Sequence, residues 1–275
     1  MPNPVQQRME DMIPELDAYH KQDIFSEDEI FQIVENRQRL ENRLNRRISK
    51  LEDYLRLAKY ELGLEHTRRS RMAEKKIQSP YLRPTPPTKR KRKNISCDYA
   101  ITRRIHSIFR AALRKHYGDI SLWLTYFDVA TFLGSKKVVS QIYGTALQKH
   151  PTQVGFWIMA ASFEANECHT PMSARVIFQR GIRVNPDSLA LWLEFFRFEA
   201  IFAVLRRLSE STTSGDENLS SIANGALALA VFDSKKSVSK PAFVQACLEI
   251  YRKILCQFSD MSLPLLEAAF SEQSK

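Results

Sequence analysis

Residues 157–192 decide the fold and read WIMAASFEANECHTPMSARVIFQRGIRVNPDSLALW. The stretch holds two segments with helical apolar spacing and a proline, Pro186, after the second one. It begins and ends on tryptophan, and with Trp123 the three indoles are 34 and 35 residues apart. Such a period is typical of a helix-turn-helix unit, which cannot bury its apolar face alone and stacks on copies of itself. We therefore predict an all-α fold, an α-solenoid of paired helices.

Other positions repeat with the tryptophans. The aligned sets are Phe109, Tyr143 and Phe178, then Leu113, Leu147 and Ile182, then Ala112, Ala146 and Gly181. We expect the small residues where two helices cross closely, with bulky side chains on either side. The predicted repeat core is Trp123, Tyr143, Trp157, Phe178 and Trp192, since aromatic residues locked to a helical period are more often core than a ligand cage or a platform for bases. A polar segment at residues 209–221 interrupts the last unit and predicts a loop.

The N-terminal region, residues 1–66, has a different pattern. Ser26 and Glu29 have the spacing of a capping box, and apolar residues then recur at steps of three and four to Leu62. We expect one long helix over residues 27–64, roughly 55 Å in length, with a shorter helical stretch folding back before it as a hairpin. Two roles stay open for this hairpin, a cap on the repeats or a docking surface for another protein.

Residues 67–98 are basic and proline-rich. Eleven Lys or Arg and one acid lie between positions 66 and 93, whereas the rest of the chain holds thirty bases and thirty acids. We expect an extended, disordered linker there, followed by the repeat solenoid at 99–275. Its basic run suits a nuclear-import signal or a phosphate contact, and the alternative is a solvated tether. The run is Lys89, Arg90, Lys91, Arg92 and Lys93; further candidates for partner or RNA contact are Arg43, Arg46, Arg47, Arg68, Arg69 and Arg71.

Several classes of protein find no support in the sequence. The four cysteines have no C-x-x-C spacing, which argues against a zinc site and a disulfide framework. The Walker, G-x-G-x-x-G, H-E-x-x-H and G-x-S-x-G motifs are absent, so we assign no catalytic, cofactor-binding or metal-binding residue. We find no signal peptide and no apolar run long enough for a membrane helix. We expect a soluble intracellular protein, not an enzyme, without a small-molecule substrate.

Two groups of motifs carry a family resemblance. The repeats, with W-x-x-Y/F, then F-E, then A-R-x-I-F-x-R-x-I and a closing Pro, resemble half-a-TPR (HAT) repeats. The region before them is similar to the start of the U3 small nucleolar RNA-associated protein 6 family. Its matching segments are residues 8–16, Ile24-Phe25-Ser26 with Glu29-Ile30, Arg46-Arg47, Glu52-Asp53-Tyr54 and Tyr60-Glu61.

The resemblance implies a non-catalytic scaffold subunit of the small-subunit processome, in the nucleus and nucleolus. Its implied partners are protein subunits of a propeller-rich subcomplex, with U3 small nucleolar RNA and pre-ribosomal RNA bound directly or indirectly, and its implied role is maturation of small-subunit (18S) ribosomal RNA. Family members continue with more HAT units beyond the point that corresponds to Lys275, which implies a fragment, a truncated gene model or a divergent short form. Two alternatives remain, a direct RNA-binding protein that uses the basic linker and a HAT scaffold of splicing or mRNA 3′-end processing.

Overall fold

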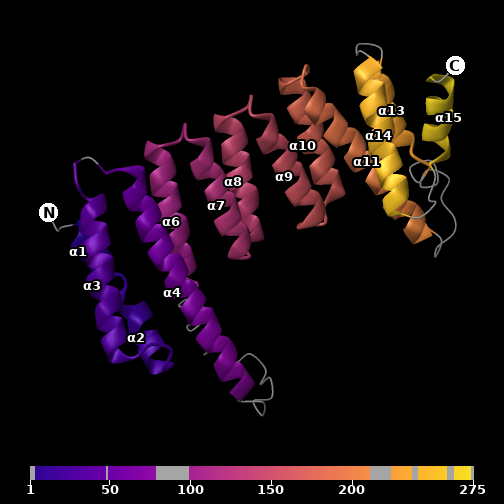
Figure 1. Cartoon of the computed structure of the whole chain (residues 1–275). Coiled ribbons are helices and arrows are strands. Elements are labelled where there is room, and N and C mark those ends of the chain that lie inside the picture. The colour runs from indigo at the N-terminus through magenta and orange to yellow at the C-terminus, as the bar shows by residue number, and fades with distance from the viewer. Residues whose placement is uncertain are drawn as a thin grey trace. The chain divides into compact units, whose positions relative to one another are not determined.

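The computed structural model describes residues 4–47, 49–78, 99–210, 224–236, 241–258 and 263–273, and every regular element in these ranges is an α-helix (Figure 1). The chain forms two compact units, residues 1–134 and 135–275. The first unit holds α1 (Pro4–Glu10), α2 (Ile13–Lys21), α3 (Glu27–Leu44), α4 (Leu51–Gln78), α6 (Ala100–Lys115) and α7 (Ile120–Phe132). The second holds α8 (Lys136–Lys149), α9 (Val154–Asn166), α10 (Pro171–Val184), α11 (Leu189–Glu210), α13 (Ala226–Lys236), α14 (Pro241–Gln257) and α15 (Pro264–Gln273). The all-α prediction is confirmed.

The predicted single helix over residues 27–64 is wrong, because the chain turns between α3 and α4. The capping box does start α3: the Glu29 amide donates to Ser26 Oγ at 3.3 Å, and the Ser26 amide donates to Glu29 Oε2 at 2.9 Å. At the other end the helix stops at Asn45, and the Lys50 amide donates to the carboxylate of Asp53 at the start of α4. The two helices pack side by side as a hairpin (Figure 1).

The predicted linker boundary at residue 67 is also wrong, since α4 continues to Gln78. Its basic residues do not disrupt the helix because several of them meet carboxylates: Arg68 and Arg69 pair with Glu65. The helix ends two residues before Pro80, as expected where proline disfavours helical backbone in the residue that precedes it. The remaining linker residues, 79–98, including Lys89 to Lys93, lie outside the described residues.

The repeats were expected to begin a separate domain at residue 99, yet α6 and α7 belong to the first unit. The reason is the packing of α6 against α4. Leu57 and Ala58 of α4 are buried, as are Ile101 and Ile105 of α6. Burying both apolar faces removes more surface from water than leaving either helix on its own.

The second unit is a series of helices in which successive members pack on each other, with α9 against α8 and α10, and α11 against α10, α13 and α14 (Figure 1). Its core runs from Trp157 to Phe270 and is rich in phenylalanine. The predicted polar loop starts later than residue 209, because α11 extends to Glu210. The rest of that loop, residues 211–221, lies outside the described residues.

The three indoles share one polar contact. Each Nε1 donates to the carbonyl oxygen six residues earlier, which is Tyr117, Pro151 or Pro186, at 2.8 to 3.0 Å. These carbonyls lie in the turn before each tryptophan's helix, so the contact fixes the turn to the helix and satisfies the indole N–H. The rings differ in burial: Trp123 and Trp157 are 2% and 7% exposed, whereas Trp192 is half-buried. Tyr143 and Phe178 are buried.

Candidate functional site

The predicted phosphate-binding arginines differ in what they contact. Arg68 Nε lies 2.8 Å and Arg69 Nε 2.7 Å from the buried carboxylate of Glu65, and Arg69 also donates to the Leu133 carbonyl at the end of α7. Burial alone would raise the pKa of Glu65, but the hydrogen bonds from the two guanidiniums lower it. Both arginines therefore already serve the packing of the first unit.

Arg71 likewise bridges segments of its own chain. Its guanidinium lies 2.6 Å and 2.8 Å from the Glu29 carboxylate and 2.8 Å from the Ile24 carbonyl oxygen. Hydrogen bonding from Arg71 lowers the pKa of Glu29 to about 2. Arg68, Arg69 and Arg71 thus make contacts within the first unit, and their role in partner or RNA contact stays a prediction.

Two of the other three candidates are more accessible. Arg46 and Arg47 are exposed in the turn after α3, and Arg43 is half-buried in the last turn of that helix. They remain candidates for partner or RNA contact.

A set of four charges, three of them buried and Arg104 half-buried, lies between the helices of the first unit, and we call it the ion quartet: Glu15, Arg37, Glu61 and Arg104. Arg37 of α3 makes a double contact with Glu61 of α4, from Nε to Oε1 at 2.8 Å and from Nη2 to Oε2 at 2.7 Å. Arg37 Nη2 and Arg104 Nη2 each lie 3.4 Å from an oxygen of Glu15 on α2. The Arg37 and Glu61 side chains are 1% and 0% exposed.

The ion quartet joins α2, α3, α4 and α6 with two positive and two negative charges. Each charge needs the opposite charges because an unpaired buried ion costs several kcal/mol. Sequence reasoning had one signal for this site: Arg37 falls in the apolar register of its helix, where a charge requires a buried partner. The sequence did not identify that partner.

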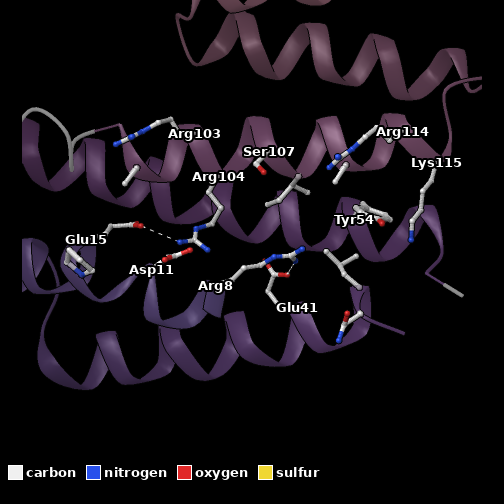
Figure 2. Close-up of a pocket in the computed structure, with 16 residues that line it drawn as sticks. Arg8, Asp11, Glu15, Glu41, Tyr54, Arg103, Arg104, Ser107, Arg114 and Lys115 are labelled. Atoms are coloured by element: carbon white, nitrogen blue, oxygen red, sulfur yellow. Dashed lines mark hydrogen bonds and ion pairs between the residues drawn. The ribbon is translucent and has the colours of Figure 1, made fainter. Parts of the chain in front are cut away.

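Next to the ion quartet the first unit opens into a cavity of about 890 Å³, which we call the α6 groove (Figure 2). Its lining comes from α1, α2, α3, α4 and α6. The residues are Arg8, Asp11, Pro14, Glu15, Glu41, Leu44, Asn45, Tyr54, Ala100, Arg103, Arg104, Ser107, Ile108, Ala111, Arg114 and Lys115. Sequence reasoning missed this site, although five bases and no acid in residues 100–115 were a signal for it.

The charges in the α6 groove are distributed unequally between its walls. On the wall made by the N-terminal helices, Arg8 Nη1 pairs with Glu41 Oε2 at 2.6 Å. On the wall made by α6, Arg103 and Arg114 are exposed toward its two ends (Figure 2). Lys115 donates to Ser49 Oγ at 2.7 Å and remains exposed. The groove can therefore offer positive charge from one side to a bound chain.

A second hollow, of about 430 Å³, lies between α9, α10 and α11 in the second unit. Its lining includes three phenylalanines, Phe178, Phe198 and Phe202. Arg175 lies 5.4 Å from the ring centroid of Phe202 and pairs with buried Glu199 at 2.5 and 2.9 Å. This ion pair holds α10 to α11 beside the hollow.

The described ranges contain no metal-binding cluster and no helix suited to a membrane. Among those residues, His, Cys, Asp and Glu side chains do not gather in groups of three or more that could hold a metal ion. The described helices also include none with the length and hydropathy needed to cross a membrane.

Comparisons with known proteins match both parts of the chain. A family model described as U3 small nucleolar RNA-associated protein 6 matches residues 9–104, and one described as PRP39 N-terminal HAT repeat matches residues 109–237. The U3 small nucleolar RNA-associated protein 6 of Schizosaccharomyces pombe is 32% identical over 80% of this chain and 43% of its own length. The homologues of Mus musculus and Homo sapiens are 31% and 27% identical, over 72% and 86% of this chain and 31% and 39% of their own lengths.

These matches confirm the resemblance to the U3 small nucleolar RNA-associated protein 6 family, and the HAT match confirms the fold class as an all-α solenoid of HAT repeats. The chain spans less than half the length of these relatives.

Proposed function

We propose that this chain, which resembles the U3 small nucleolar RNA-associated protein 6 family over most of its length, is a non-catalytic scaffold of the small-subunit processome. The observation that carries the proposal is the joint occurrence of two features, the N-terminal region matched over residues 9–104 and the HAT region matched over 109–237. HAT repeats alone would fit several RNA-processing assemblies. The N-terminal region favours this one.

The physical support is the surface that paired helices present. Stacked helix pairs provide extended faces for other chains. In the second unit Met172, Val176, Leu205 and Leu208 are large apolar side chains that are exposed. A partner that covers such side chains removes apolar surface from water, which makes binding more favourable.

The partners in this proposal are protein subunits of the propeller-rich processome subcomplex, with U3 small nucleolar RNA and pre-ribosomal RNA bound through them or directly. The proposed localisation of the protein is the nucleus, and within it the nucleolus. The role is holding other subunits during maturation of small-subunit (18S) ribosomal RNA.

The identity of the partners tests the proposal. The tagged 275-residue chain is expressed in eukaryotic cells, purified from nuclear extract, and its co-purifying proteins are identified by mass spectrometry. We expect ribosome-biogenesis proteins to be enriched over an untagged control. Enrichment of splicing or mRNA 3′-end processing proteins instead would assign the chain to another HAT assembly.

Direct RNA binding is a second candidate function, favoured by the concentration of charge. Eleven bases lie between positions 66 and 93, and α6 adds five bases without an acid. If this is the function, the purified chain binds single-stranded RNA with an affinity that falls steeply with salt, because bound phosphates release counterions. Neutralising the eleven bases at residues 68–93 should then abolish most of the binding, whereas a scaffold keeps its protein partners after this change.

A further inference from the structure

Every charged side chain on the α6 wall of the α6 groove is basic. Helix α6 carries five bases and no acid over its 16 residues. Arg103 and Arg114, both exposed and both lining the groove, are 11 residues apart. This separation is about three helical turns, so the two side chains lie on one face, roughly 16 Å apart along the axis.

The apolar part of the lining, which we call the floor, is formed by half-buried Leu44 and Ala111. Ile108 also lines the groove but is 6% exposed, and exposed Ser107 lies between Arg103 and Arg114 in the sequence. A floor of this kind accepts aliphatic side chains, whereas the bases at its rim attract carboxylates. The cavity of about 890 Å³ is in the size range of sites for drug-sized ligands, so it can take a few side chains of a longer segment.

One feature disfavours a nucleic acid in the α6 groove. The carboxylates opposite α6, exposed Asp11 and the Arg8-paired Glu41, act against a phosphate backbone and a bound carboxylate alike and do not separate the two. The one aromatic side chain of the lining, Tyr54, is 5% exposed and offers no ring face on which a base could stack.

We infer that the α6 groove binds an acidic, amphipathic segment of another protein, with its aliphatic side chains on Leu44 and Ala111 and its carboxylates toward Arg103 and Arg114. The distance between the two arginines matches about eleven residues of helix or about five of extended chain. This inference rests on the proposed scaffold function, for which it names the chemistry of one partner segment.

The test uses the intact 275-residue chain and a fluorescent peptide of about twelve residues, in which Leu recurs at steps of three and four and Glu fills the other positions. Its control replaces every Glu by Lys. Binding is followed by fluorescence anisotropy at physiological salt. We expect the acidic peptide to bind and the basic peptide to bind at least about tenfold more weakly, because it meets like charges at the rim.

Variants then locate the site. The double variant Arg103→Glu with Arg114→Glu should weaken binding of the acidic peptide at least about tenfold. Its matched control is Arg39→Glu with Lys59→Glu, which reverses two exposed bases outside the lining and should change the affinity less than about twofold. Ser107→Trp fills the groove without changing its charge and should weaken binding about fivefold or more. Circular dichroism melting checks that each variant stays folded.

Three results would overturn the inference. The first is that the acidic peptide does not bind. The second is that the groove variant, Arg103→Glu with Arg114→Glu, and its matched control lose the same amount of affinity for the acidic peptide. The third is an oligouridine of equal charge that binds more tightly than the peptide and loses affinity in the groove variant, which would assign the groove to RNA. The peptide assay uses only purified chain and a defined peptide, so it is independent of the co-purification experiment. Failure of the peptide to bind would contradict the groove inference alone, and failure of ribosome-biogenesis proteins to co-purify would contradict the proposed function alone.

Discussion

At the scale of single residues, Gly181 and Trp157 show how closely the helix pairs pack. A Cβ atom at position 181 would lie 3.0 Å from Cδ2 of the Trp157 ring and 3.1 Å from a methyl carbon of Leu191. Only glycine, which has no side chain, lets α10 approach Trp157 of α9 and Leu191 of α11 this closely. The period in the sequence thus reflects a steric requirement as well as a hydrophobic one.

Replacing Trp157 by Ala should cost about 3 to 5 kcal/mol of the free energy of unfolding, since a buried indole and its hydrogen bond to the Pro151 carbonyl are lost. Trp192→Ala is the matched control, because Trp192 makes the same kind of hydrogen bond but is half-buried. Urea denaturation of both variants measures the difference. Equal losses would contradict the assignment of Trp157 to the core.

His106 should make stability depend on pH. Burial, and then the positive charge of Arg110, lower its pKa to about 4, and its Nδ1 lies 3.2 Å from the Tyr126 hydroxyl. The unfolded chain takes up a proton near pH 6.5 while the native ring stays neutral, so this contribution is unchanged above about pH 6.5. Below it, stability falls by up to about 1.4 kcal/mol per pH unit toward pH 4.

The variant His106→Gln should flatten the fall in unfolding free energy between about pH 6.5 and about pH 5, a range where most carboxylates do not titrate. His20→Gln, at an exposed histidine, is the control and should keep the parent's slope. Urea denaturation of the parent and both variants at about pH 6.5 and about pH 5 measures how far the free energy of unfolding falls in each protein. Parallel slopes for the parent and His106→Gln would show that His106 is not held neutral.

At the scale of elements, the ion quartet fastens four helices of the first unit. Arg37→Leu should cost about 3 to 5 kcal/mol, because Glu61 and Glu15 are left buried with less opposite charge. The double variant Arg37→Leu with Glu61→Leu should recover most of this loss, since the Glu15–Arg104 pair remains. Chemical denaturation of the four proteins in the double-mutant cycle measures the coupling.

Arg56→Leu is the control for this cycle. It removes an exposed pair with Glu52 on the same helix as Glu61, and the expected change is below about 1 kcal/mol. A double variant no more stable than Arg37→Leu alone would contradict the role of the ion quartet.

The elements also show what a sequence can predict here. The period of the tryptophans predicts the paired helices, and the Ser26–Glu29 capping box places the start of α3, because both signals lie within one or two neighbouring segments. The turn after Asn45 and the helix beyond residue 67 were missed. Contacts between distant residues, such as Arg71 with Glu29, 42 positions away, hold α4 against α3, and the sequence does not show which residues will meet. The α6 groove was missed for the same reason, since five helices contribute its lining.

At the scale of the whole molecule, the division into two units changes how partners should be mapped. Removing residues 1–66 would cut inside α4 and take away the helices that bury the apolar face of α6. Loss of a partner after such a truncation would report unfolding of the first unit. Point variants at the exposed side chains of the α6 groove avoid this problem.

Whether the chain holds proteins or RNA is tested most directly by nuclease treatment. The tagged 275-residue chain is purified from nuclear extract in two halves, one treated with ribonuclease and one not, and the bound proteins of each are quantified by mass spectrometry. A scaffold that contacts proteins through its helix pairs predicts that the same ribosome-biogenesis proteins remain in both halves. Their disappearance from the treated half would show that RNA forms the link and would contradict the scaffold function.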